Sequence, residues 1–215
     1  MLASRSRRLL LLTAAFLSLV SAGGILNGTS IRPPQTRSDS FWRLLSINTL
    51  EVEHYDSLDS MTSGSEAVVL GKIVGVSLSR TFGGQEDAEP IRLAALEVSV
   101  SRILAGRLTK AATTIAVEVT IPGGRNIEDL QAAIPTEEAM YFLRNKGTEA
   151  SDLGFTPEEI EVEAPYYRLV SSQGQIRNLG GAALPPEAAE DSFLVDLRGT
   201  PFSEVTSQVL VAGRA

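Results

Sequence analysis

The sequence predicts a mainly β fold: a small, closed or nearly closed antiparallel barrel of five to six strands, with one short inserted helix and one C-terminal helix. Apolar and polar residues alternate over 96–104 and 115–121, which is typical of strands with one buried face. Residues 66–78 form a long apolar segment in which Gly71 and Gly75 suit a strand that coils sharply around a barrel. Strands do not alternate with long helices, so a parallel α/β sheet is not expected.

Short helical signals precede the first strand. Apolar residues over 41–50 predict a short helix or an irregular segment that packs on the domain, with Trp42 as a core or docking residue rather than a ligand platform. Residues 57–61 predict one helical turn whose two apolar side chains share a side. A polar loop over 80–90 then joins the first two strands.

The second half of the barrel carries cap and turn signals. Asn126 can serve as the N-cap of a short helix over 127–134, and residues 140–144 predict a fourth strand. Residues 166–171 and 175–179 flank a glycine-containing turn and therefore predict a hairpin.

The C-terminal segment predicts an amphipathic helix over residues 201–211, with Thr200 as its N-cap and Pro201 in its first turn. The side chains expected to share one face are those of Phe202, Val205 and Val209. We expect this helix to cap the barrel or pack on its side, with partner binding as the alternative.

The first 22 residues have the three-part layout of an export signal. Arginines at positions 5, 7 and 8 precede an apolar run, residues 9–20, and small residues at 20–22 fit a cleavage site. The run is shorter than the roughly 20 apolar residues that span a bilayer, so cleavage is favoured over a retained N-terminal anchor. The paired arginines also resemble a twin-arginine signal, although the Sec route is favoured.

Four parts are expected along the chain. They are a signal peptide (1–22), a flexible Gly-, Ser- and Pro-rich tether (23–40), the β-barrel domain (41–180), and a C-terminal extension with the amphipathic helix (181–215). The expected location is secreted or extracytoplasmic.

Composition restricts the function. Signal removal takes away three arginines and no acid, so the net charge changes from −7 to −10, which disfavours nucleic acid and anionic membrane surfaces as partners. No cysteine is present, so no disulfide can form, and a single histidine leaves few ligands for a zinc, haem or iron–sulfur site. No cofactor or metal is expected.

Five segments follow one another in a characteristic order: residues 65–73 (SEAVVLGKI), 100–106 (VSRILAG), 115–119 (IAVEV), 139–143 (AMYFL) and 167–176 (YRLVSSQGQI). This order resembles a loose group of uncharacterised exported bacterial proteins thought to fold like the OB-type barrel of netrin-like domains and tissue inhibitors of metalloproteinases. The resemblance covers about residues 57–180 and implies an OB-like barrel. Those inhibitors chelate zinc through an N-terminal cysteine, which is missing here, so no functional residue is carried over.

Candidate catalytic groups are few. His54, with Asp56 or Asp59 as its orienting carboxylate, is the only histidine that a Ser-His-Asp triad could use, and no G-x-S-x-G motif accompanies it. An idle, exposed histidine is the favoured interpretation.

Carboxylates are dense in two places, Glu137-Glu138 and the set Glu158, Glu159, Glu161 and Glu163. A glycosidase needs two carboxylates facing each other across a cleft, which sequence clustering does not provide. Glu161 and Glu163 fit the solvent face of a strand beside Ile160 and Val162, and calcium-loop spacing is absent.

OB-type barrels often bind ligands on one sheet face with aromatic and basic residues. The candidate aromatics are Tyr141, Phe142, Tyr166 and Tyr167, of which at least half should be core by strand alternation.

These observations favour an exported, non-enzymatic binding or protein-interaction module of the bacterial cell envelope, with an unknown protein or envelope ligand as partner and no stable membrane insertion after cleavage. The alternatives are an envelope hydrolase that uses paired carboxylates and a structural envelope component.

Overall fold

The computed structural model describes residues 37–45, 53–83, 90–109, 111–186 and 192–214. The predicted signal peptide and residues 23–36 of the predicted tether lie outside this part of the chain. The described residues all belong to one compact unit. Within the described residues, no helix has the length and apolar character needed to cross a membrane.

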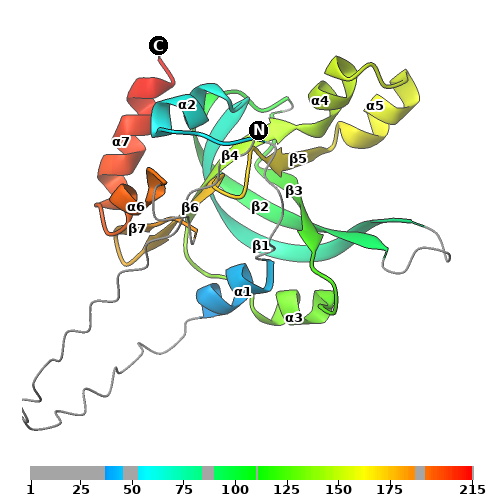
Figure 1. Ribbon diagram of the computed structural model, residues 1–215, viewed down its shortest axis with the longest axis horizontal. Helices are drawn as coiled ribbons and strands as arrows, with labels where there is room; N and C mark the ends of the chain where they lie inside the picture. The colour runs from blue at the N-terminus through cyan, green and yellow to red at the C-terminus, as the bar shows by residue number, and fades with distance from the viewer. Residues whose placement is uncertain (1–36, 46–52, 84–89, 110, 187–191, 215) are drawn as a thin grey trace, which may run out of the picture. The chain divides into compact units, whose positions relative to one another are not determined.

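The described strands are β1 (Ala67–Phe82), β2 (Ile91–Gly106), β3 (Thr114–Ile121), β4 (Ala139–Asn145), β5 (Tyr166–Leu169), β6 (Gln175–Leu179) and β7 (Ala182–Leu184). The described helices are α1 (Arg37–Leu45), α2 (Leu58–Ser63), α3 (Ile127–Ala132), α4 (Lys146–Asp152), α5 (Pro157–Glu163), α6 (Leu194–Leu197) and α7 (Phe202–Ala212). The fold is therefore mainly β, as predicted (Figure 1).

Five strands close into a ring. β1 pairs with β2, β2 with β3, β3 with β5, β5 with β4, and β4 again with β1, while β6 and β7 extend the sheet from β4. The expectation of a wholly antiparallel arrangement is wrong, because β3 and β5 run parallel, with Ala116 beside Tyr166. The sheet is mixed, and α4, α5 and α6 are helices that the sequence did not predict.

The predicted hairpin of residues 166–171 and 175–179 does not form. β5 and β6 both pair antiparallel with β4, at successive positions: Leu143 faces Leu169, and Tyr141 faces Gln175. Between them the chain bulges away and returns to the same strand, since Val170 N donates to the carbonyl of Phe142 and Phe142 N donates to the carbonyl of Gly174. The glycine-containing segment is thus a bulge within one line of pairing rather than a chain reversal.

Two apolar clusters hold the unit together. The first fills the ring and includes Val69, Leu96, Val117 and Tyr141. The second lies between the opposite face of β1 and β4 and the helices α2 and α7, and its fully buried members include Met61, Phe142 and Val205. Alternate residues of β4 and of the first part of β1 contribute to the two clusters, which is why residues 67–70 and 139–143 are all apolar.

β1 and β2 are longer than predicted. β1 continues through residues 80–82, the first three residues of the predicted polar loop over 80–90, and Phe82 pairs with Ile91 at the end of the arm that β1 and β2 form. This part of the arm extends past β4, which pairs with β1 only between Ala67 and Gly71. None of the residues 77–82 of β1 is fully buried, so this part of the strand lacks the buried apolar face on which the prediction of a strand relies.

The helices explain several local signals. α1 begins at Arg37, within the range predicted as tether, and inserts Phe41 fully into the ring cluster, with Trp42 half-buried beside it. Residues 57–61 form the start of α2 as predicted. Asn126 caps α3 as predicted, its side chain accepting from Asp129 N at 2.8 Å.

α7 also buries its predicted face, Phe202, Val205 and Val209, against the second cluster. Thr200 does not cap it, because its hydroxyl donates to the carbonyl of Asp196 instead. Pro201 precedes the helix, so the cap position offers no side-chain hydrogen bond.

Candidate functional site

A helical hairpin that the sequence did not predict lies between β4 and β5. It comprises α4 and α5, residues 146–163, and we call it the α4–α5 hairpin. Figure 1 shows it on the far side of the ring from α7. Glu161 and Glu163 therefore lie on a helix, and the prediction that they face solvent from a strand is wrong.

Asn145 ties the two ends of the hairpin together. Its side-chain oxygen accepts from Thr148 N at 3.1 Å and caps α4, while its amide donates to the carbonyls of Ala164 at 3.0 Å and Tyr166 at 3.3 Å. A Cβ on Gly147 would lie 2.7 Å from Cα of Ala164, so only glycine permits this close crossing. The hairpin thus leaves and rejoins the sheet at one point.

Four charged side chains fix the hairpin to the ring, and we call them the Arg80 cluster: Arg80 on β1, Glu118 on β3, Lys146 on α4 and Glu163 at the end of α5. Lys146 Nζ lies 2.6 Å from Glu118 and 3.1 Å from Glu163. The Arg80 guanidinium pairs with both carboxylates, its Nε donating to Glu118 at 3.0 Å. Glu118 also accepts from the Ser79 hydroxyl, and its side chain is 2% exposed.

The electrostatics of this cluster are balanced. Burial alone would raise the pKa of Glu118, but hydrogen bonds from Arg80, Lys146 and Ser79 outweigh it and hold that pKa below its ordinary value. The hydrogen bond from Arg80 is the largest influence on Glu163 and lowers its pKa as well. The Arg80 guanidinium carbon also lies over two aromatic rings, 5.4 Å from the centroid of Phe82 and 5.0 Å from that of Tyr166.

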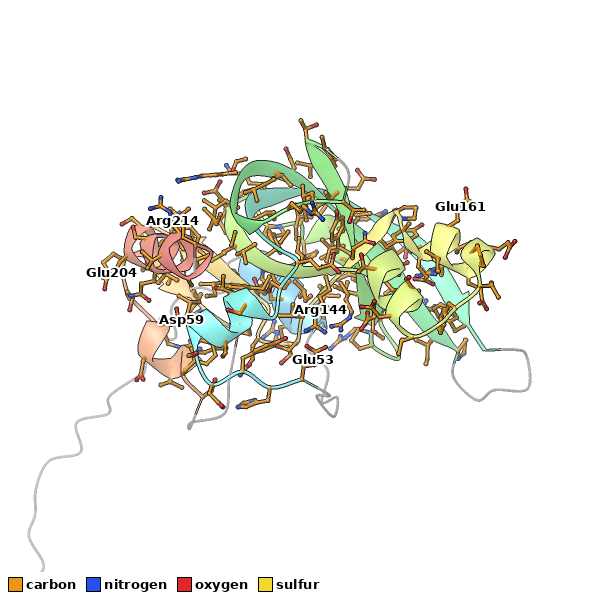
Figure 2. All side chains as sticks on the ribbon, turned by 90° about the horizontal axis from the view of Figure 1, so that it is seen from above. Glu53, Asp59, Arg144, Glu161, Glu204 and Arg214 are labelled. Carbon is orange, nitrogen blue, oxygen red and sulfur yellow. The ribbon has the colours of Figure 1, made fainter. Side chains whose placement is uncertain are left out.

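A second set of four charges, which we call the Arg168 cluster, lies at the same end of β4. It comprises Glu53, Arg144, Glu149 and Arg168. Arg168 donates to Glu149 at 2.6 and 2.7 Å and to Glu53 at 2.7 Å. Arg144 donates to Glu53 at 2.9 Å, and Figure 2 shows these two side chains next to each other.

The Arg168 cluster also anchors α4 through Glu149, whose pKa is lowered chiefly by its hydrogen bond with Arg168. Burial would raise the pKa of Glu53, but hydrogen bonds from Tyr55 and Arg168 and the nearby Arg144 charge lower it. Each cluster contains two acids and two bases. Their carboxylates are ionised and saturated with donors, which suits anchoring and not proton transfer.

The outer end of the hairpin is apolar and exposed. Leu153 and Phe155 are 70% and 47% exposed, and Gly154 between them adopts φ +77°, which turns the chain from α4 into α5. Val162, on α5, is 57% exposed. We call residues 152–155 the hairpin tip.

Exposed acidic side chains lie close to these apolar residues in the sequence. Asp152, Glu158, Glu159 and Glu161 are all exposed, and Figure 2 shows Glu161 pointing outward from α5. Glu159 accepts from Thr156 N at 2.9 Å and completes a capping box at the start of α5. The only basic residue between positions 146 and 165 is Lys146, which the Arg80 cluster uses.

The predicted catalytic candidates are not assembled into a triad. His54 lies 3.7 Å from Asp56, with side chains 64% and 95% exposed, and Asp59 is an exposed residue in the first turn of α2. Glu138 accepts from the Ser101 hydroxyl at 2.6 Å. In the described part of the chain, no group of three or more His, Cys, Asp or Glu side chains could hold a metal ion.

Three of the four candidate aromatics, Tyr141, Phe142 and Tyr167, are buried in the two apolar clusters. The prediction that at least half are core is confirmed. Tyr166 stays half-buried beside Arg80.

A pocket of about 320 Å³ lies next to Tyr167, lined by residues that include Glu97, Thr109, Ala116 and Pro165. Glu97 is its only ionisable side chain besides the buried tyrosine, so the pocket offers little to fix a ligand.

Comparisons with protein-family models, curated proteins and solved structures find no match to this chain. The interpretation of the site therefore rests on its own geometry. Sequence reasoning missed the Arg80 cluster entirely, and the one local signal for the hairpin was the capping-box pattern Thr156-Pro157-Glu158-Glu159.

Proposed function

We propose that this protein is an exported, non-enzymatic interaction module of the bacterial cell envelope, and that it binds a protein partner through the α4–α5 hairpin. The observation that carries the proposal is the hairpin tip: Leu153 and Phe155 are held out into solvent on a turn whose base is fixed by two ionic clusters. Large apolar side chains on a rigid, projecting support are typical of interaction sites.

We further propose that the ring is an OB-like barrel. Its strand order β1-β2-β3-β5-β4, the parallel contact of β3 with β5 and the position of α3 between β3 and β4 support this assignment. OB-like barrels commonly bind ligands with the connections between their first and second and their fourth and fifth strands. The α4–α5 hairpin is the connection between β4 and β5, so the analogy supports the same surface.

The saturation of the two clusters argues against the hydrolase alternative. A hydrolytic acid needs a pKa raised toward neutrality, whereas the four cluster carboxylates have lowered values.

Crosslinking capture with residues 23–215 from the cell envelope tests the proposal. Leu153→Ser combined with Phe155→Ser should abolish capture of a reproducible partner. The matched control is Val195→Ser combined with Val211→Ser, because these apolar residues are also exposed, at 45% and 69%, but lie on α6 and α7. Equal capture by wild type and the hairpin variant would refute the proposed surface.

A further inference from the structure

The charge around the hairpin tip defines the chemistry of its partner, an inference that rests on the proposed function. We infer that the tip docks into an apolar pocket of a protein whose rim carries lysine or arginine side chains. The apolar residues supply the contact that excludes water, and the acids around them select a basic rim.

The argument starts from the apolar residues. Leu153 and Phe155 lie two positions apart on a turn with little freedom, since α4 is capped by Asn145 and α5 by Thr156. The ring does not cover these two side chains: the Arg80 cluster holds the base of the hairpin, the Arg168 cluster holds the middle of α4 at Glu149, and Leu153 and Phe155 stay exposed. A partner can therefore bury both side chains without reordering the hairpin, which keeps the entropic cost of docking low.

Charge complementarity identifies the rim. Four exposed acids lie within ten residues that include the tip: Asp152, Glu158, Glu159 and Glu161. The one basic residue of the hairpin, Lys146, is already paired with Glu118 where the hairpin joins the ring. Docking brings these acids close to the partner surface, where an acidic or purely apolar rim would leave them repelled or desolvated. A basic rim forms charge-assisted hydrogen bonds with them.

The same charges disfavour two other occupants. An anionic lipid surface would repel the tip. A second copy docking tip to tip would bring eight acids together, and the chain is already acidic overall, at −7 for the full sequence. The inference therefore commits to a basic-rimmed protein partner.

The test uses three synthetic amphipathic helical peptides with identical leucine positions and with lysine, glutamine or glutamate at all other positions. Binding of each labelled peptide to the chain is measured by fluorescence anisotropy at 50 and 300 mM NaCl. The hairpin variant is Asp152→Asn with Glu158→Gln, Glu159→Gln and Glu161→Gln, which retains the capping box because glutamine can replace glutamate there.

The matched control removes the same number of exposed acids elsewhere: Asp59→Asn, Glu128→Gln, Asp196→Asn and Glu204→Gln. Figure 2 shows Asp59 and Glu204 far from Glu161. The apolar variant is Leu153→Ser with Phe155→Ser.

We expect the lysine peptide to bind at least tenfold more tightly than the other two, and its affinity to fall at the higher salt concentration. The apolar and the hairpin-acid variants should each weaken it about tenfold or more, and the control should weaken it less than threefold. An equal loss in the control would overturn the inference by showing attraction to net charge alone.

Three further results would overturn it: equal binding of the glutamate peptide, tighter binding to neutral phosphatidylcholine vesicles than to the lysine peptide, or dimerisation of the chain that the apolar variant abolishes. If the apolar variant loses envelope capture while the hairpin-acid variant keeps both capture and peptide binding, the proposed function stands and this inference fails. If neither variant affects capture, the proposed function itself fails.

Discussion

Replacing Glu118 with glutamine removes one charge from the Arg80 cluster while it nearly preserves the shape of the side chain. Wild-type Glu118 is 2% exposed and accepts hydrogen bonds from Ser79, Arg80 and Lys146. After the substitution, Arg80 and Lys146 share Glu163 as their only carboxylate in the cluster, and the amide group cannot accept at both of its heavy atoms.

The expected cost follows from burial. Breaking a buried ion pair by removing one partner costs about 3–5 kcal/mol. The side chains of Arg80 and Lys146 are 18% and 20% exposed, so water partly solvates the charges that lose their partner. We therefore expect the free energy of unfolding to fall by about 2–4 kcal/mol. For a domain of this size, that loss lowers the Tm by roughly 4–16 °C.

Urea unfolding at pH 7, followed by circular dichroism, measures the loss. Glu97→Gln is the control, because Glu97 lies on the neighbouring strand β2 and is exposed. It should change stability by less than about 0.5 kcal/mol. The double variant Glu118→Gln with Lys146→Gln should lose less unfolding free energy than the sum of the losses of the two single variants, because the second substitution removes a charge that the first left unpaired. A Glu118→Gln loss no greater than the control would refute the anchoring role of the cluster.

Three further predictions concern the whole unit. Gly106→Ala should lower the free energy of unfolding in urea by about 2–4 kcal/mol, because φ is +64° and a Cβ would lie 2.0 Å from the carbonyl oxygen of Glu66. Gly180→Ala, at φ +61° with open space around it, should lower it by about 1 kcal/mol. Equal losses would contradict this reasoning. The four cluster carboxylates have pKa values below the ordinary 4.5 in the folded protein, so the unfolded chain takes up protons first as the pH falls. The urea midpoint should therefore stay constant above about pH 5.5 and fall as the pH drops below 4.5. A midpoint that does not change with pH would contradict the assignment. A chain ending at Gly199 loses the three buried apolar side chains of α7, whose burial contributes about 5–9 kcal/mol, and should show no cooperative unfolding by calorimetry. A sharp transition would contradict the role of α7 in the second cluster.

The elements that the sequence predicts correctly are those whose signals are local. The face of α7, the cap of α3 at Asn126 and the alternation of β3 each depend on neighbours within about four positions. The pairing of β5 and β6 with β4 is a long-range property, and the glycine-containing segment 170–174 satisfied the local rule for a hairpin equally well. Turn chemistry alone does not distinguish a reversal from a bulge when a third strand can accept both segments.

The sequence did not predict the α4–α5 hairpin because α5 has no buried residue. Its sequence therefore lacks the apolar residues at a period of 3.6 that indicate an amphipathic helix. The alternation of Ile160 and Val162 with Glu161 and Glu163 instead matched a strand. What keeps the segment helical is the capping box at Thr156 and the ion pairs of Glu163, whose partner Arg80 lies 83 positions away in the sequence. The parallel contact of β3 with β5 brings these charges together, and it was not predicted either. Because α5 is capped at Thr156 and anchored by the ion pairs of Glu163, it is held in one orientation although it contributes no buried residue. This orientation supports the preceding turn, on which Leu153 and Phe155 are exposed to solvent.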